Sequence, residues 1–156
     1  MEAMIFRLLD MSRSRTLQIA ADVTESQADV VPEGFNNNIR WNLGHIVTVQ
    51  ERFAFRLIGE PMDLPEELMS LFVGGTKPAD WQTPAPGLAE LRTLLEEQPE
   101  RIRKRIEGRL DEKLKVPFKE LDRLADVLAF GVGHEGLHAG YIQALKRVVA
   151  QTESGR

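Results

Sequence analysis

Apolar residues recur at the three- and four-residue spacing of amphipathic helices in four separate runs of this 156-residue chain. The first run extends from about residue 2 to the mid-twenties, and a Pro-Gly segment at residues 31–34 ends it. The second begins near Asn38 and ends at Gly59 and Pro61. Two helices are therefore predicted in the first sixty residues.

The second half of the chain carries the other two runs, at about residues 88–106 and 122–149. Pro99 lies inside the first of them and is expected to kink or interrupt the helix, because proline removes a backbone donor. Between the runs, residues 114–118 alternate apolar side chains with lysine and proline, which predicts a short extended piece and no sheet.

Four helical runs without a convincing sheet predict an all-α fold, a four-helix bundle. At this length one compact domain suffices, and we assign it residues 1–150 with a frayed tail at 151–156. The segment 60–86 is long for a connection, so we expect a crossover between the second and third helices.

The predicted crossover carries Leu71, Phe72 and Trp81, which a polar loop would not need. We expect these side chains to pack near one end of the bundle and to help close a pocket there. A structural cover and a contact in a homodimer are the alternatives.

Composition narrows the possible partners and compartments. Twenty basic residues face twenty-four acidic ones, for a net charge of −4 without a basic run, which argues against nucleic acid. The chain has no cysteine, no N-terminal pattern of a signal peptide and no apolar run as long as a membrane span. A cytoplasmic protein with no membrane association is expected, and any metal site must rest on His, Asp or Glu.

The three histidines are the strongest candidate for chemistry. His134 and His138 stand four residues apart in the last helix and therefore share a face, and His45 lies in the second helix. A fold that joins these two helices forms a three-histidine metal site. The alternative is that each histidine is a hydrogen-bonded core or boundary residue.

Four glycines crowd the helix around the histidine pair, although each costs roughly 0.5–1 kcal/mol relative to alanine in a helix interior. They predict either close backbone approach or free space beside the histidines. The four are Gly131, Gly133, Gly136 and Gly140.

Two further residues of the last helix are candidate catalytic groups, Glu135 and Tyr141. His134-Glu-Gly-Leu-His138 satisfies the H-E-x-x-H pattern of zinc proteases, in which the glutamate is the base. That interpretation is disfavoured, because the only downstream third ligand is Glu153 and no strand-rich half is evident. Glu135 would otherwise orient a ligand imidazole across a helix interface, whereas Tyr141 is placed to contact substrate.

The segments Arg40-Trp-Asn-Leu-Gly-His-Ile46 and His134-Glu-Gly-Leu-His-Ala-Gly-Tyr-Ile142 together resemble the DinB-like family, including its YfiT-type members. The crossover sequence at residues 72–78 is also similar. This resemblance covers the whole chain and implies a divalent metal, zinc or nickel, held by His45, His134 and His138. Despite the shared name, the family is distinct from the DNA polymerase.

Members of that family with assigned activities transfer a low-molecular-weight thiol such as bacillithiol or mycothiol to an electrophile, or isomerise maleylpyruvate with it. Others are described as metal-dependent hydrolases. The expected function is thus metal-dependent thiol transfer to a small-molecule substrate. A hydrolase and a non-catalytic metal- or ligand-binding protein are the alternatives.

A metal held by neutral imidazoles keeps its charge and open positions, so a bound water or thiol would lose its proton near neutral pH. Trp41, Asn42 and Thr48 lie three or four residues from His45 and are candidates to surround the site.

Overall fold

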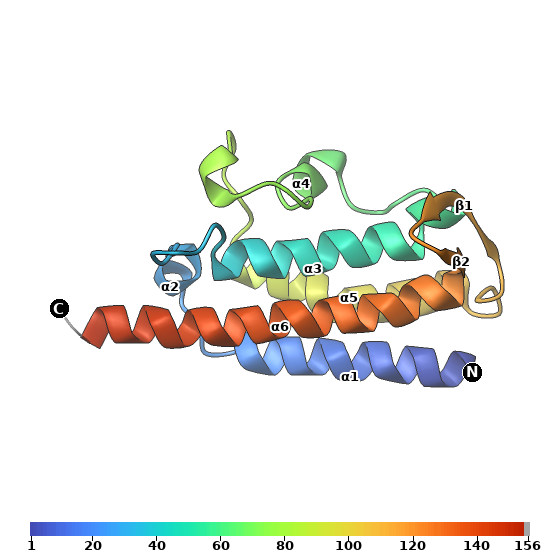
Figure 1. Cartoon of the computed structure of the whole chain (residues 1–156), viewed down its shortest axis with the longest axis horizontal. Helices are drawn as coiled ribbons and strands as arrows, with labels where there is room; N and C mark the ends of the chain where they lie inside the picture. Colours follow the sequence, from blue (N-terminus) through green and yellow to red (C-terminus); the bar gives the residue numbers. More distant parts are fainter. Residues whose placement is uncertain (155–156) are drawn as a thin grey trace.

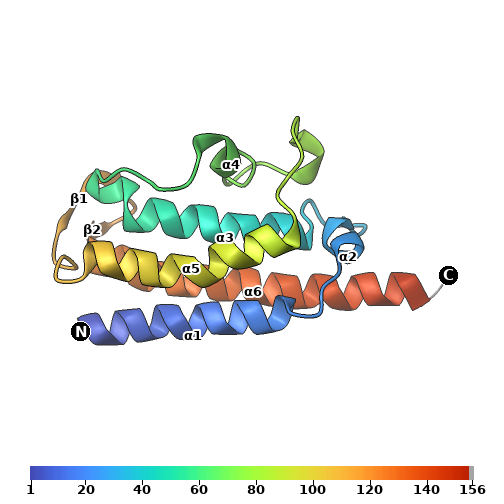
Figure 2. The same ribbon diagram turned by 180° about the vertical axis from the view of Figure 1, so that it is seen from behind.

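Four long helices form the body of the protein in the computed structural model, which describes the backbone of residues 1–154 and the side chains of residues 1–152. Figures 1 and 2 show these helices side by side, with α1 and α3 each in contact with both α5 and α6. The prediction that the fold is built mainly of helices is confirmed. The four are α1 (Glu2–Ala20), α3 (Ile39–Ala54), α5 (Leu88–Ile106) and α6 (Leu124–Ser154).

The first helix is shorter than the periodicity predicts. It ends at Ala20, and a separate helix α2 (Glu25–Asp29) follows. Thr24 explains the break, because its hydroxyl accepts a hydrogen bond from the Gln27 backbone in a capping box and so begins a new helix.

A small antiparallel hairpin corrects the all-α prediction. β1 (Lys113–Phe118) pairs with β2 (Leu121–Arg123), and the fold is therefore mostly helical with a two-stranded sheet. The turn between the strands contains Lys119 at a positive φ of 52°. Glycine or asparagine usually marks such a turn, and neither occurs here, so the pattern predicted only β1, as an extended piece.

The crossover follows the short helix η1 (Arg56–Ile58) and covers the outer side of α3 (Figure 1). It contains the short elements α4 (Glu66–Ser70) and η2 (Pro78–Asp80). Phe72 is fully buried, and Leu71 and Trp81 pack against the same apolar cluster as α3. These side chains thus cover the chain's own core.

Gly44 of α3 is required for this cover. A Cβ at residue 44 would lie 2.5 Å from the Phe72 ring, closer than any ordinary contact. The alanine variant Gly44→Ala is expected to lower the free energy of unfolding by about 1–3 kcal/mol, the usual cost of overpacking. Urea denaturation measures this change.

Gly136→Ala is the matched control, because its Cβ would meet nothing within 4 Å on an exposed part of α6. There alanine should stabilise the helix by about 0.5–1 kcal/mol. Equal effects of the two substitutions would contradict the role of Gly44.

Pro99 does not interrupt α5, which continues through it, and a kink at this residue stays a prediction. Proline has no N–H to donate to the carbonyl four residues earlier, which is that of Leu95. The guanidinium of Arg13 donates to this oxygen instead, at 2.7 Å. A side chain from α1 therefore satisfies the backbone group that Pro99 leaves free.

Arg13 belongs to a buried polar layer between two apolar clusters, one toward each end of the helices. Each long helix contributes to this layer, since its members are Arg13 and Thr16 of α1, Glu51 of α3, Gln98 of α5 and Glu135 of α6.

Helix α6 extends to Ser154, so most of the segment predicted to be a frayed tail is helical. Residues 155–156 of that segment lie outside the described part of the chain. The glycines of α6 show two kinds of environment. A Cβ at Gly131 would meet Gln50 and Phe53 at 3.0 and 3.2 Å, whereas those at the other three would meet nothing within 4 Å.

Candidate metal centre

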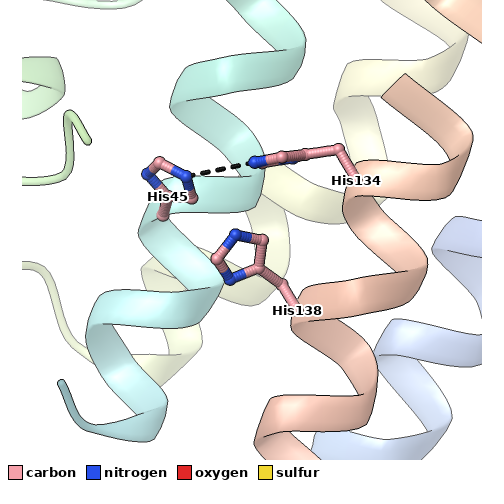
Figure 3. A group of neighbouring side chains, drawn as sticks. All are labelled: His45, His134 and His138. Carbon is pink, nitrogen blue, oxygen red and sulfur yellow. Dashed lines mark hydrogen bonds between the residues drawn. The ribbon is translucent and has the colours of Figure 1, made fainter. Parts of the chain in front are cut away.

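The three histidines converge between α3 and α6 (Figure 3). His45 projects from α3 toward His134 and His138, which stand one turn apart on α6. One ring nitrogen from each lies within 4.8 Å of those of the others. The packing of these two helices therefore assembles a cluster that could hold a metal ion.

Hydrogen bonding determines which nitrogen of His45 faces the cluster. Its Nδ1 lies 2.6 Å from the carbonyl oxygen of Phe72. Because a carbonyl can only accept, Nδ1 carries the proton, and the neutral ring has its lone pair on Nε2. The crossover thus orients a candidate ligand through its backbone.

His138 is oriented in the same way by a side chain. Its Nδ1 donates to Oδ1 of Asn42 at 2.8 Å, and the amide nitrogen of Asn42 donates to the carbonyl of Asn38 at 2.8 Å. Asn38 also caps α3 by accepting from the Trp41 backbone. This chain of contacts leaves the Nε2 lone pair of His138 free to bind a metal ion.

The donor set fits a divalent metal. Nε2 of His45 and Nε2 of His134 lie 3.3 Å apart. Two imidazole nitrogens on one tetrahedral zinc at 2.0–2.1 Å are separated by about 3.3 Å. Three neutral imidazoles, two of them with Nδ1–H bound to an oxygen acceptor, form a donor set that suits zinc or nickel.

Burial keeps these imidazoles neutral. Burial, together with the neighbouring imidazole of His45, lowers the pKa of His134 to about 4 and that of His138 to about 3. Burial also lowers the pKa of His45, against the effect of the Phe72 carbonyl. Neutral imidazole is the form that binds metal, so protons compete weakly for the site.

The metal-free protein is expected to lose stability as the pH falls from about 6.5 toward 4. In this window the unfolded histidines bind protons and the folded ones do not, because the pKa values of His134 and His138 are lowered in the folded state. Thermal melts of chelator-treated protein across this range test the expectation. His134→Gln should flatten the dependence, and an unchanged slope in that variant would contradict it.

Glu135 does not join the histidines. It is 2% exposed and accepts hydrogen bonds from Arg13 and Thr16 of α1, each at 2.9 Å. Its carboxylate is therefore part of the buried polar layer, and its position does not support a catalytic role.

In this position Glu135 cannot serve as the general base that the zinc-protease interpretation requires. Its third ligand is also too far away, since Glu153 follows His138 by fifteen residues on the same helix, about 22 Å along the axis.

Tyr141 lies beside the cluster, in a cavity of about 530 Å³ that also contains His138 and Asn42. The tyrosine is half-exposed and stands edge-on to Phe35, with ring centroids 6.3 Å apart. The rest of the lining mixes apolar residues, among them Trp41 and Leu137, with the amide side chains of Asn36 and Asn37. Tyr141 thus lines a cavity next to the candidate metal centre, and its contact with substrate stays a prediction.

A second cavity of about 400 Å³ borders the cluster and contains His45 and His134. Its walls are mostly apolar, and its two charged lining residues are Arg52 and Lys119. The histidines therefore lie between two cavities of different chemistry. Sequence periodicity did not reveal this second cavity, because the hairpin brings Lys119 to it.

Comparison with known proteins identifies the family. Residues 8–142 match the DinB superfamily, which is most of the chain. This chain belongs to the DinB superfamily. The resemblance noted in the sequence is thereby confirmed.

A solved structure supports the fold of this DinB-superfamily protein. The conserved protein of a locus from Enterococcus faecalis superposes with a TM-score of 0.67 at 14% identity, over 96% of each chain. At this identity the likeness concerns the fold alone. No sequence among the curated proteins matches the chain.

Trp41 and Thr48, which were also predicted to surround the candidate metal centre of this superfamily member, lie in different environments. Trp41 stacks on His45, with ring centroids 4.5 Å apart and planes 13° from parallel. Thr48 is fully buried, and its hydroxyl has no hydrogen-bond partner among the described residues.

None of the helices within residues 1–154 has the length and apolar character needed to cross a membrane.

Proposed function

We propose that this protein transfers a low-molecular-weight thiol, such as bacillithiol or mycothiol, to a small electrophile. A divalent metal held by His45, His134 and His138, zinc or nickel, would supply the positive charge that lowers the pKa of the thiol. One observation carries the proposal: two cavities of unlike chemistry border the histidine cluster, one at His138 and the other at His45 and His134. A reaction between two different substrates needs such an arrangement.

The more polar of the two cavities, which contains His138, suits the thiol cosubstrate. Asn36, Asn37 and Asn42 offer amide donors and acceptors for hydroxyl and amide groups. Oδ1 of Asn37 is buried without a hydrogen-bond partner among the described side chains, and a bound donor would satisfy it. The Tyr141 hydroxyl lies in the same cavity and would contact the cosubstrate.

The protein's own contribution is orientation. Phe72 and Asn42 hold the Nδ1 protons of two histidines, which keeps the Nε2 lone pairs aimed at one point. In the transfer, a bond forms between sulfur and the electrophilic carbon, the leaving group departs with its electron pair, and the thiol proton passes to solvent.

Turnover with candidate thiols tests this function. Zinc- or nickel-loaded protein is mixed with chlorodinitrobenzene and bacillithiol, mycothiol or glutathione, and both thiol loss and product absorbance are followed. One thiol should be consumed faster than in the metal-free control. Tyr141→Phe should lower kcat/KM by roughly ten-fold, the effect of one hydrogen bond to substrate, while metal content stays the same.

Either of two other results would favour a different function. Hydrolysis of a chromogenic ester that needs metal but no thiol would favour a metal-dependent hydrolase. Metal binding without turnover in either assay would favour a non-catalytic metal- or ligand-binding protein.

A further inference from the structure

The second cavity is walled by three mutually packed aromatic rings. Phe53 contacts Phe118 and Phe130 at centroid distances of 5.0 and 5.9 Å, and the latter two are 5.5 Å apart. Phe53 also stands edge-on to His134 at 6.1 Å. The rings therefore form an apolar wall that leads to the candidate metal centre.

Two cations are the charged groups of this cavity, and neither has an acidic partner. Within residues 1–152, no carboxylate pairs with Arg52 or Lys119, and no acidic residue lines the cavity. On the neighbouring helix α5, by contrast, most arginines are bound by carboxylates, as Arg101 is by Glu51. Arg52 is half-buried, so its unpaired charge lacks the full hydration of a surface arginine.

Lys119 reaches the cavity from the turn of the hairpin. Its ammonium group lies 5.8 Å from the centroid of the Phe118 ring and 5.5 Å from that of Phe130. The backbone of this residue has a positive φ, which glycine would adopt with less strain. Conformation alone thus gives no reason for a lysine at the turn.

We infer that this cavity binds the acceptor substrate, and that this substrate is a small acidic compound with a flat apolar body and a carboxylate. The aromatic wall would contact the body, and Arg52 and Lys119 would bind the carboxylate. A volume of about 400 Å³ suits a small molecule. The role as acceptor rests on the proposed thiol transfer, whereas the preference for an acidic ligand rests on the cavity alone.

Naphthoate and its neutral analogue naphthamide are suitable probes, because they share a flat body and differ in charge. Calorimetric titration of metal-free and zinc-loaded protein gives both affinities. Naphthoate should bind at least about ten-fold more tightly than naphthamide, the factor expected for hydrogen bonds to a charged group.

Four variants test whether naphthoate binding depends on the two cations of the cavity or on the overall charge of the protein. Arg52→Gln should weaken naphthoate binding roughly ten-fold, and Lys119→Gln about three-fold because this side chain is exposed. Arg56→Gln makes the same charge change at an exposed residue that does not line the cavity, and should have no effect. Naphthamide binding should stay within about two-fold throughout, and Arg52→Lys should retain most of the affinity.

The inference is overturned if naphthoate does not bind, if both probes bind equally, or if naphthoate binding is indifferent to Arg52 and Lys119. Binding that requires zinc but neither cation would mean that the carboxylate contacts the metal directly, and would also overturn it. If the cation-dependent preference appears but no thiol is consumed in the turnover assay, thiol transfer fails and the acidic-ligand site stands.

Discussion

Replacing His138 with alanine is expected to weaken zinc binding by more than about 100-fold, because the loss of a direct ligand exceeds the 10–100-fold effect of an outer contact. His45→Ala and His134→Ala should have similar effects, since each imidazole supplies one donor to the same cluster. Unmodified protein should bind one metal per chain. Mass spectrometric metal analysis after dialysis and competition with a chromogenic chelator measure both quantities.

Asn42→Ala provides the graded control. It removes the acceptor of the His138 Nδ1 proton but no ligand atom, so the affinity should fall by roughly 10–100-fold with the stoichiometry unchanged. Metal stabilisation gives an independent readout, since zinc at 1,000 times its Kd adds about 4 kcal/mol to the stability. Unchanged metal content in all three histidine variants would refute the site.

Replacing Glu135 with alanine is expected to lower the free energy of unfolding by about 3–5 kcal/mol, the cost of leaving one member of a buried ion pair without its partner. Arg13 is 3% exposed, and without this carboxylate its buried charge would keep two neutral partners, the Leu95 carbonyl and the Gln98 amide. Thr16 would lose its acceptor as well. Denaturant titration of the metal-free protein measures the loss.

Glu96→Ala is the control on an exposed face of α5 and should change stability by less than about 0.5 kcal/mol. The folded fraction of Glu135→Ala should still bind one metal, because this carboxylate lies away from the histidines. Loss of metal binding or of metal-dependent turnover, with stability intact, would instead make Glu135 a catalytic group.

The network around Arg13 also explains why α5 tolerates Pro99. In a Pro99→Ala background the Leu95 carbonyl regains a backbone donor. Arg13→Met should therefore cost less stability in that background than in the unmodified protein. A double-mutant cycle measures this coupling, which should lie in the range of about 0.5–3 kcal/mol found for residues in contact.

Local patterns of the sequence predicted the features that depend on neighbouring residues. Periodicity located the long helices, because burial of one face repeats with the helical turn. The spacing of His134 and His138 placed both on one face of α6, and Asn38 marked the start of α3 through its cap. The same patterns missed β2, because its three residues and a lysine turn carry little local information.

Contacts between distant segments were decided only by the tertiary structure. Helical geometry turns Glu135 about 100° away from His134, but the sequence could not show that Arg13 of α1 lies on that side and binds Glu135. The acceptor for His45 is a backbone carbonyl at Phe72, which any residue there would present, so no side chain in the sequence marks it. Likewise, Lys119 reaches the cavity only because the hairpin folds back beside α6. Helix periodicity thus determined which residues could meet, and packing between helices, crossover and hairpin decided which of them did.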